Sequence, residues 1–239
     1  APLTPAQRQF FEDVTVDRHH YNQSILLEVP PGFDVARCER ALDAVIGHHE
    51  SLRLRFTHDA DGWRQSVEET ASRSQVPVFA LADVPADQRA RQVETLGAQV
   101  QASLDLDRGP LIGAAVFDFG PAEAGRLLIA AHHLSVDGVS WRVLLDDLTS
   151  AYAALAEHDS VVLPPVPTPF LDWAATLTPS TPVPAPSGTG DNQVSAVREQ
   201  AIVLDATATR RLLTVAPEVY QAGPTDVLLA ASALAYADW

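Results

Sequence analysis

The sequence predicts an α/β (α+β) fold, a two-layer sandwich in which helices cover a mainly antiparallel sheet. Three observations predict this class. Apolar residues alternate between positions 21 and 29, as in a strand with one buried face. Pairs of apolar runs within residues 52–69 and 111–132 are separated by turn residues, as in β-hairpins. Residues 35–49 and 141–155 place apolar side chains three or four positions apart, as in amphipathic helices.

The first part of the chain is predicted to form a short helix, a strand, a longer helix and a hairpin. Thr4 is a candidate cap for the short helix, and Pro5 occupies its first position, where a missing N–H costs nothing. Asp34 is placed to cap the longer helix. The dipeptide Asp61-Gly62 predicts the turn of the first hairpin.

The middle of the chain is predicted to contain a short apolar run, a polar helix and a second hairpin. The apolar run covers residues 76–81, and Pro85 opens the polar helix. The second strand of the hairpin, residues 127–132, is almost wholly apolar. It therefore predicts a central strand that is buried on both faces.

Composition predicts two units joined by a linker. We expect one lobe over residues 1–175, a Pro/Ser/Thr-rich linker over 176–195 and the start of a second lobe over 196–239. Eight of the 18 prolines fall between residues 164 and 186, a density that is typical of extended linkers.

The last unit is predicted to contain a strand over residues 198–204 and two helices, which Asp205 and Thr225 would cap. About 45 residues rarely bury enough surface to fold alone, so this unit should dock on the first or belong to a larger lobe. The chain contains no Met and starts at Ala1, which favours an excised piece. A processed N-terminus is the alternative.

Charge and composition argue against several classes of protein. There are 31 acidic and 16 basic residues, and the formal charge of −15 argues against a nucleic-acid binder. No apolar run approaches the roughly 18 residues of a membrane span. We therefore expect no nucleic-acid or membrane partner and a cytoplasmic location. The single cysteine, Cys38, excludes an intramolecular disulfide and any multi-Cys metal site.

The clearest candidate site is the stretch HHLSVDG, in which His132 and His133 end the buried strand. Alternation along a strand puts the two rings on opposite faces, so that one can face a cleft while the other packs inward. Gly138 would permit a tight turn. Asp137 could orient a histidine or pair with Arg142.

Other interpretations of the histidines stay open. Both rings of the motif can instead be satisfied interior groups, with Asp137 only stabilising the turn. We expect no metal here, because two adjacent strand histidines cannot easily reach one ion. The pairs His19-His20 and His48-His49 are expected to have surface or capping roles.

The same residues carry a resemblance to a known family. HHLSVDG followed by VSWRVLLDDL resembles the His-His-x-x-x-Asp-Gly motif of the condensation-domain superfamily of nonribosomal peptide synthetases. PLTPAQRQFFED and HHYNQSILLEVP resemble the opening motif and the Asn-Gln-Ser strand of its epimerization branch, which Ser-Trp-Arg also fits better than peptide-bond-forming domains. PEVYQAGPTDVLLAASALAYADW resembles the start of that branch's second lobe. The chain thus resembles the N-terminal lobe of an epimerization domain and the start of its C-terminal lobe.

The resemblance implies a lobe like chloramphenicol acetyltransferase and a reaction on a tethered substrate. An epimerization domain inverts the Cα of an aminoacyl or peptidyl group that is held as a thioester on a carrier protein. His133 matches the catalytic histidine of the family. The motif and its surroundings supply the supporting residues His132, Asp137, Gly138, Trp141 and Arg142. No cofactor of its own is implied, since the phosphopantetheine belongs to the carrier; the partners are that carrier and neighbouring synthetase domains.

Two departures from the family pattern bear on activity. Family members consist of two lobes, and the second catalytic residue, a Glu in a Glu-Gly-His-Gly-Arg-like stretch, is expected beyond Trp239. Thr225 stands where the branch often has Asn. We expect a parent domain that is an epimerase and an isolated chain that is incomplete and inactive. The alternatives are a non-catalytic spacer or carrier-docking module, and condensation-type acyl transfer.

Overall fold

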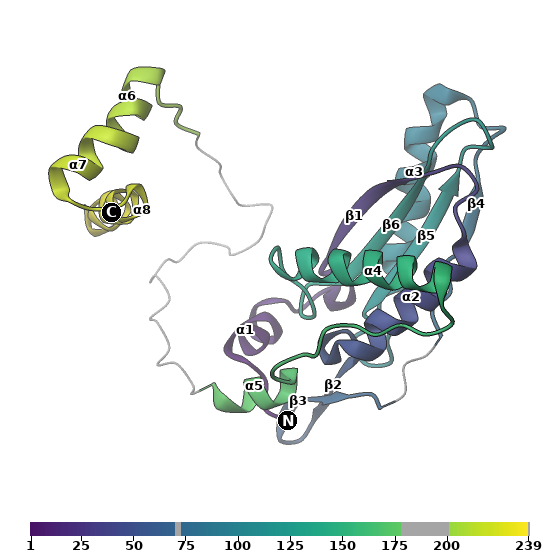
Figure 1. Ribbon diagram of the computed structural model, residues 1–239. Helices are drawn as coiled ribbons and strands as arrows, with labels where there is room; N and C mark the ends of the chain where they lie inside the picture. The colour runs from purple at the N-terminus through teal and green to yellow at the C-terminus, as the bar shows by residue number, and fades with distance from the viewer. Residues whose placement is uncertain (70–72, 178–200, 239) are drawn as a thin grey trace. The chain divides into compact units, whose positions relative to one another are not determined.

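The computed structural model describes residues 1–69, 73–177 and 201–238. The chain divides into two compact units, Ala1–Thr181 and Pro182–Trp239 (Figure 1). Within the described residues, the first unit contains a four-stranded sheet in the order β1-β6-β5-β4 and a two-stranded sheet of β2 and β3. The α/β class is confirmed. The strands are β1 (Asn22–Val29), β2 (Leu54–Asp59), β3 (Gly62–Val67), β4 (Val78–Ala80), β5 (Ile112–Asp118) and β6 (Gly125–His132).

The four longest described helices of the first unit begin close to where the sequence predicts, whereas the helix Phe170–Thr176 and two short 3₁₀ helices were not predicted. The Thr4 hydroxyl accepts a hydrogen bond from the Gln7 N–H, and the Thr4 N–H donates to the Gln7 side-chain oxygen. These two bonds make a capping box. Asp34 accepts from the Arg37 N–H at 2.9 Å. Both predicted caps are therefore confirmed. The helices are α1 (Pro5–Asp13), η1 (Arg18–His20), α2 (Val35–His48), η2 (Glu50–Arg53), α3 (Ala86–Ala102), α4 (Ser140–Glu157) and α5 (Phe170–Thr176).

Strand β6 lies at the centre of the larger sheet, as its apolar sequence predicts. It pairs antiparallel with β1 and β5, and β4 alone of the described strands runs parallel to its neighbour. Ile129 packs on α2 and α4, whereas Leu128 packs on α3. Helices therefore cover both faces of this sheet, one more layer than the expected sandwich (Figure 1).

The hairpin of β2 and β3 packs with α1 in a separate aromatic cluster. Phe11 stacks on Trp63 with 3.9 Å between ring centroids, and Phe56 is fully buried beside them. The hairpin loop is Ala60-Asp61 and Gly62 already belongs to β3, so the turn lies one residue earlier than predicted. The cluster supports the end of β6, because Phe10 of α1 packs edge-on against the His132 ring.

The described secondary structure of the second unit is helical. Residues 206–220 form α6 (Ala206–Arg210), a π-helical segment η4 (Arg211–Val215) and α7 (Ala216–Tyr220), followed by α8 (Pro224–Asp238). None of the described helices is long and apolar enough to cross a lipid bilayer.

One predicted cap of this unit is confirmed and two other expectations are wrong. Asp205 accepts from the Ala208 N–H, as expected of a cap. Residues 201–204 form no strand, because no described strand lies beside them and their apolar side chains stay exposed. Thr225 lies inside α8 rather than capping it. Residues 198–200 and most of the predicted linker lie outside the described residues, and the lobe boundaries stay a prediction.

Candidate active site

The end of β6 places His133 beside the first residues of β1. The His133 N–H donates to the Tyr21 carbonyl at 2.8 Å, which continues the β1–β6 pairing by one step. The Tyr21 ring stacks on the imidazole of His133, with 4.9 Å between centroids and 16° between planes. His133 is partly exposed, and one face of its ring is covered by Tyr21.

Hydrogen bonds determine which nitrogen of His133 carries the proton. Nδ1 lies 2.9 Å from the Val136 carbonyl oxygen, which can only accept, so Nδ1–H donates. The Trp141 indole N–H donates to Oε1 of Gln23 at 3.0 Å, which turns the amide nitrogen of Gln23 toward His133. That nitrogen lies 3.1 Å from Nε2, and an amide NH₂ only donates. The ring is therefore the neutral Nδ1–H tautomer, with a lone pair on Nε2.

His132 points into the protein interior, on the other face of the strand from His133, as alternation along the strand predicts. Its side chain is fully buried; Nε2–H donates to the Arg18 carbonyl at 2.8 Å and Nδ1 accepts from the Leu134 N–H. Burial away from water lowers the pKa of His132 to about 4, against the opposing effect of the Arg18 hydrogen bond. The ring is a neutral interior group that links the end of β6 to η1.

Asp137 stabilises the loop that follows the histidines. Its Oδ1 accepts from the Ser140 hydroxyl at 2.7 Å and from the N–H groups of Ser140 and Val139. These hydrogen bonds, the Ser140 hydroxyl above all, hold the pKa of the Asp137 carboxyl below its usual value. Arg142 is exposed and forms no ion pair with a described residue, so of the two roles left open for Asp137 the pairing with Arg142 is not found. The loop that Asp137 stabilises includes Val136, whose carbonyl accepts the hydrogen bond from Nδ1 of His133.

Gly138 does not have the backbone conformation that the sequence suggested. Its φ is not in the left-handed region, and a Cβ at this position would meet no atom within 4 Å. The turn is made by the side chain of Asp137, so no glycine is required for it. The expectation that Gly138 permits a tight turn is therefore wrong.

Sequence reasoning missed two residues that contact His133, Gln23 and Tyr21. Both lie in the alternating run of residues 21–29, which predicted only a strand with one buried face. The available signal was a polar glutamine within an otherwise apolar stripe. Its partners could not be identified, because Gln23 is more than a hundred positions from His133.

The other histidine pairs have different environments. Nε2 of His49, the C-cap residue of α2, lies 2.7 Å from a carboxylate oxygen of Asp147 in α4. His48, His49 and Asp147 place ligand atoms within 4.8 Å of one another. His19 accepts from the Leu106 N–H at 3.0 Å. The capping position expected for the second pair is thus found at the end of α2.

Comparison with known proteins connects this geometry to a family. Residues 1–182 match the family model described as "Condensation domain". One linear gramicidin synthase protein of Brevibacillus parabrevis is 39% identical over 259 residues, which cover 100% of this chain and 3% of that protein. Surfactin synthase subunit 2 of Bacillus subtilis (strain 168) is 34% identical over 262 residues, which cover 99% of this chain and 7% of that protein.

Solved structures agree with these relatives. The epimerization domain from the third module of tyrocidine synthetase B superposes with a TM-score of 0.67 at 37% identity, covering 73% of this chain and 39% of that one. The starter condensation domain of rhizomide synthetase superposes with a TM-score of 0.56 at 27% identity, covering 65% and 36%. The chain thus spans well under half of either solved domain, and its lobe has their fold, as the sequence resemblance implies. Together with the match to residues 1–182, these relatives show that the chain belongs to the condensation domain family of nonribosomal peptide synthetases.

Proposed function

We propose that His133 moves the Cα proton of an aminoacyl or peptidyl thioester, so that this chain supplies one side of an epimerization site. The observation that carries the proposal is the meeting of two motif stretches at one ring. Gln23 belongs to the Asn-Gln-Ser strand and Trp141 to Ser-Trp-Arg, and both stretches resemble the epimerization branch. Their side chains join in one hydrogen-bonded chain that ends on Nε2 of His133.

The chemistry follows from the tautomer. A thioester acidifies the Cα–H bond, because the electron pair left on carbon is delocalised into the carbonyl as an enolate. The lone pair of Nε2 accepts the proton as the C–H bond breaks. The resulting imidazolium keeps its Nδ1–H bond to the Val136 carbonyl, and that bond strengthens once the ring is charged. The substrate must first displace the Gln23 amide from Nε2.

Inversion also needs a proton delivered to the opposite face of the carbon. We propose that this second group is the Glu of the family's other lobe, outside these 239 residues. The isolated chain is then an incomplete catalyst, which agrees with its covering 39% of the solved epimerization domain. The proposed partners are a carrier protein, whose phosphopantetheine holds the substrate, and neighbouring synthetase domains, in the cytoplasm.

The test is deuterium uptake from D₂O at the Cα of a carrier-bound aminoacyl thioester. The protein is this sequence continued by a complete second lobe. His133→Ala should slow exchange by about 10²- to 10⁴-fold, the usual contribution of a general acid–base group. His48→Ala is the matched control, since it removes a histidine from another part of the first unit. Full exchange by His133→Ala would refute the proposal, and robust inversion by the 239-residue chain would refute the two-sided mechanism.

Condensation-type acyl transfer is the second candidate, because the family model and the starter condensation domain both match this lobe. The same Nε2 would then receive a proton from the attacking amine. Donor and acceptor thioesters supplied together distinguish the two reactions, since condensation forms an amide and epimerization forms the other stereoisomer of the donor. A complete domain that does neither would favour the non-catalytic spacer or carrier-docking role.

A further inference from the structure

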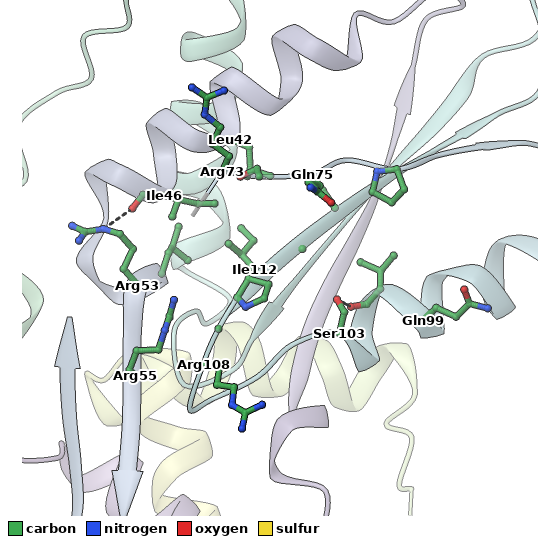
Figure 2. Close-up of a pocket in the computed structure, with 18 of the residues that line it drawn as sticks. Leu42, Ile46, Arg53, Arg55, Arg73, Gln75, Gln99, Ser103, Arg108 and Ile112 are labelled. Carbon is green, nitrogen blue, oxygen red and sulfur yellow. Dashed lines mark hydrogen bonds between the residues drawn. The ribbon is translucent and has the colours of Figure 1, made fainter. Parts of the chain in front are cut away.

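A cavity of about 470 Å³ lies in the first unit, lined by residues that take no part in the site around His133 (Figure 2). Its size is within the range of ligand pockets. Leu42 and Ile46 of α2 and Ile112 of β5 form part of its apolar wall. Four arginines also line it: Arg53, Arg55, Arg73 and Arg108. We call this cavity the arginine groove.

The charge of the arginine groove is opposite to that of the chain. Acidic residues outnumber basic ones by 31 to 16, yet no carboxylate is among the described residues that line the groove. Arg55 is paired with Glu68, and Arg53 donates to the Ile46 carbonyl. Arg73 and Arg108 are exposed, and their side chains form no hydrogen bond or ion pair with a described residue, although Arg108 interacts electrostatically with Asp105. Arg73 is therefore available to an anionic ligand, which would share Arg108 with Asp105.

The groove also runs along an incomplete edge of the sheet. Strand β4 pairs only with Val116–Asp118, and the Val116 N–H donates to the Pro77 carbonyl at 2.9 Å. Backbone groups alternate in direction along an antiparallel ladder, so those of Ile112 and Ala114 point to the same side as Val116, away from β6. No described strand lies beside them there. Within the part of the chain that the structure describes, this edge of β5 is therefore unpaired where it lines the groove.

The segment that would otherwise cover this edge is held by α2 instead. The Ser74 N–H donates to the Asp43 carboxylate at 2.6 Å, and the Val76 N–H donates to the Glu39 carboxylate at 2.9 Å. The hydroxyl of Ser74, which lines the groove, is buried without a hydrogen-bond partner among the described residues. The open edge thus lies next to a further unsatisfied polar group.

We propose that the arginine groove binds an extended acidic peptide, which adds a strand to β5 at Ile112–Ala114. The β5 edge presents backbone carbonyls, which repel an anion, as well as N–H groups, which attract it. A peptide backbone supplies both acceptors and donors at strand spacing, so it suits this edge better than a small anion does. Arg73 and Arg108 would select carboxylate side chains on that strand. This site is independent of the proposed epimerization.

The test uses the 239-residue chain and a fluorescein-labelled octapeptide of alternating Glu and Val, followed by fluorescence anisotropy. We expect saturable binding that weakens as salt is raised. A Lys-Val octapeptide should not bind. An octapeptide N-methylated on one edge should bind about tenfold more weakly or worse, because it loses backbone hydrogen bonds.

Substitutions distinguish binding in the arginine groove from non-specific electrostatic attraction between the peptide and the chain. Arg73→Gln with Arg108→Gln should weaken binding by about tenfold or more, because two charge-assisted contacts are lost. Arg91→Gln, at an exposed position of α3, is the matched control and should leave binding unchanged. Equal binding of the N-methylated peptide, or equal loss in the control, would overturn the proposal. The proposal would also be overturned if the chain self-associates, the double variant abolishes this self-association and the peptide does not compete with it. The β5 edge would then pair with a second copy of the chain.

Discussion

Two histidine pairs of the first unit show how the group opposite an imidazole decides what the ring can do. At the end of β6, His133 faces a carbonyl through Nδ1 and the Gln23 amide through Nε2. At the end of α2, His49 faces the Asp147 carboxylate. A carboxylate only accepts, so it holds a ring N–H in place, whereas a carbonyl on one nitrogen and an amide donor on the other leave a lone pair on Nε2 of His133. The first arrangement suits proton transfer and the second fastens α2 to α4.

The largest effect on activity is expected when His133 is given a carboxylate neighbour like that of His49. In the complete two-lobed protein, Gln23→Glu would place a carboxylate opposite Nε2, which would then carry a proton and lose its basic lone pair. We expect Cα–proton exchange to fall by about 10²- to 10⁴-fold, as for loss of the base itself. Trp141→Phe, which only removes the donor to Gln23, is the milder comparison. Exchange that survives Gln23→Glu would contradict the role of the tautomer.

The buried member of the first pair should make stability depend on pH. The pKa of His132 falls from 6.5 to about 4 on folding, so between these values the unfolded chain binds more protons than the folded one. Stability should therefore fall as the pH falls from 6.5 to 4, by about 3 kcal/mol from this group. Urea unfolding across that range should give a shallower dependence for His132→Gln. The same slope in both proteins would show that His132 is not the titrating group.

Breaking the second pair should cost stability without affecting exchange. The side chains of His49 and Asp147 are 16% and 13% exposed, so their interaction is partly shielded from water. We expect Asp147→Asn to lower the free energy of unfolding by about 1–3 kcal/mol, between the values for exposed and buried pairs. Exchange by the complete protein should stay near that of the wild type. A large loss of exchange with intact folding would assign this pair to the active site.

The smallest effect is expected at Gly138. Because φ is not left-handed and the Cβ position is open, Gly138→Ala should change the free energy of unfolding by no more than about 0.5 kcal/mol. Thermal and urea unfolding of the 239-residue chain measure this directly. A cost well above 1 kcal/mol would mean that the loop needs glycine after all.

Local sequence patterns predicted most of the helices and strands of the first unit. The features that could not be predicted depend on contacts between residues that are far apart in the sequence. Strand alternation placed His132 and His133 on opposite faces, and the caps Thr4 and Asp34 followed from residue type and position. Gln23 was missed because its role depends on side chains brought to it by folding. The strand expected over residues 198–204 was predicted from apolar composition, but a strand also needs a neighbour to pair with.

Nitrogen-15 NMR of the imidazole of His133 tests the central claim most directly. Two-bond ¹H–¹⁵N correlations of the 239-residue chain at pH 8 distinguish a protonated from an unprotonated ring nitrogen, and His133→Gln assigns the signals. We predict a protonated Nδ1 and an unprotonated Nε2, as the Val136 carbonyl and the Gln23 amide require. The opposite tautomer, or a doubly protonated ring at that pH, would contradict the account.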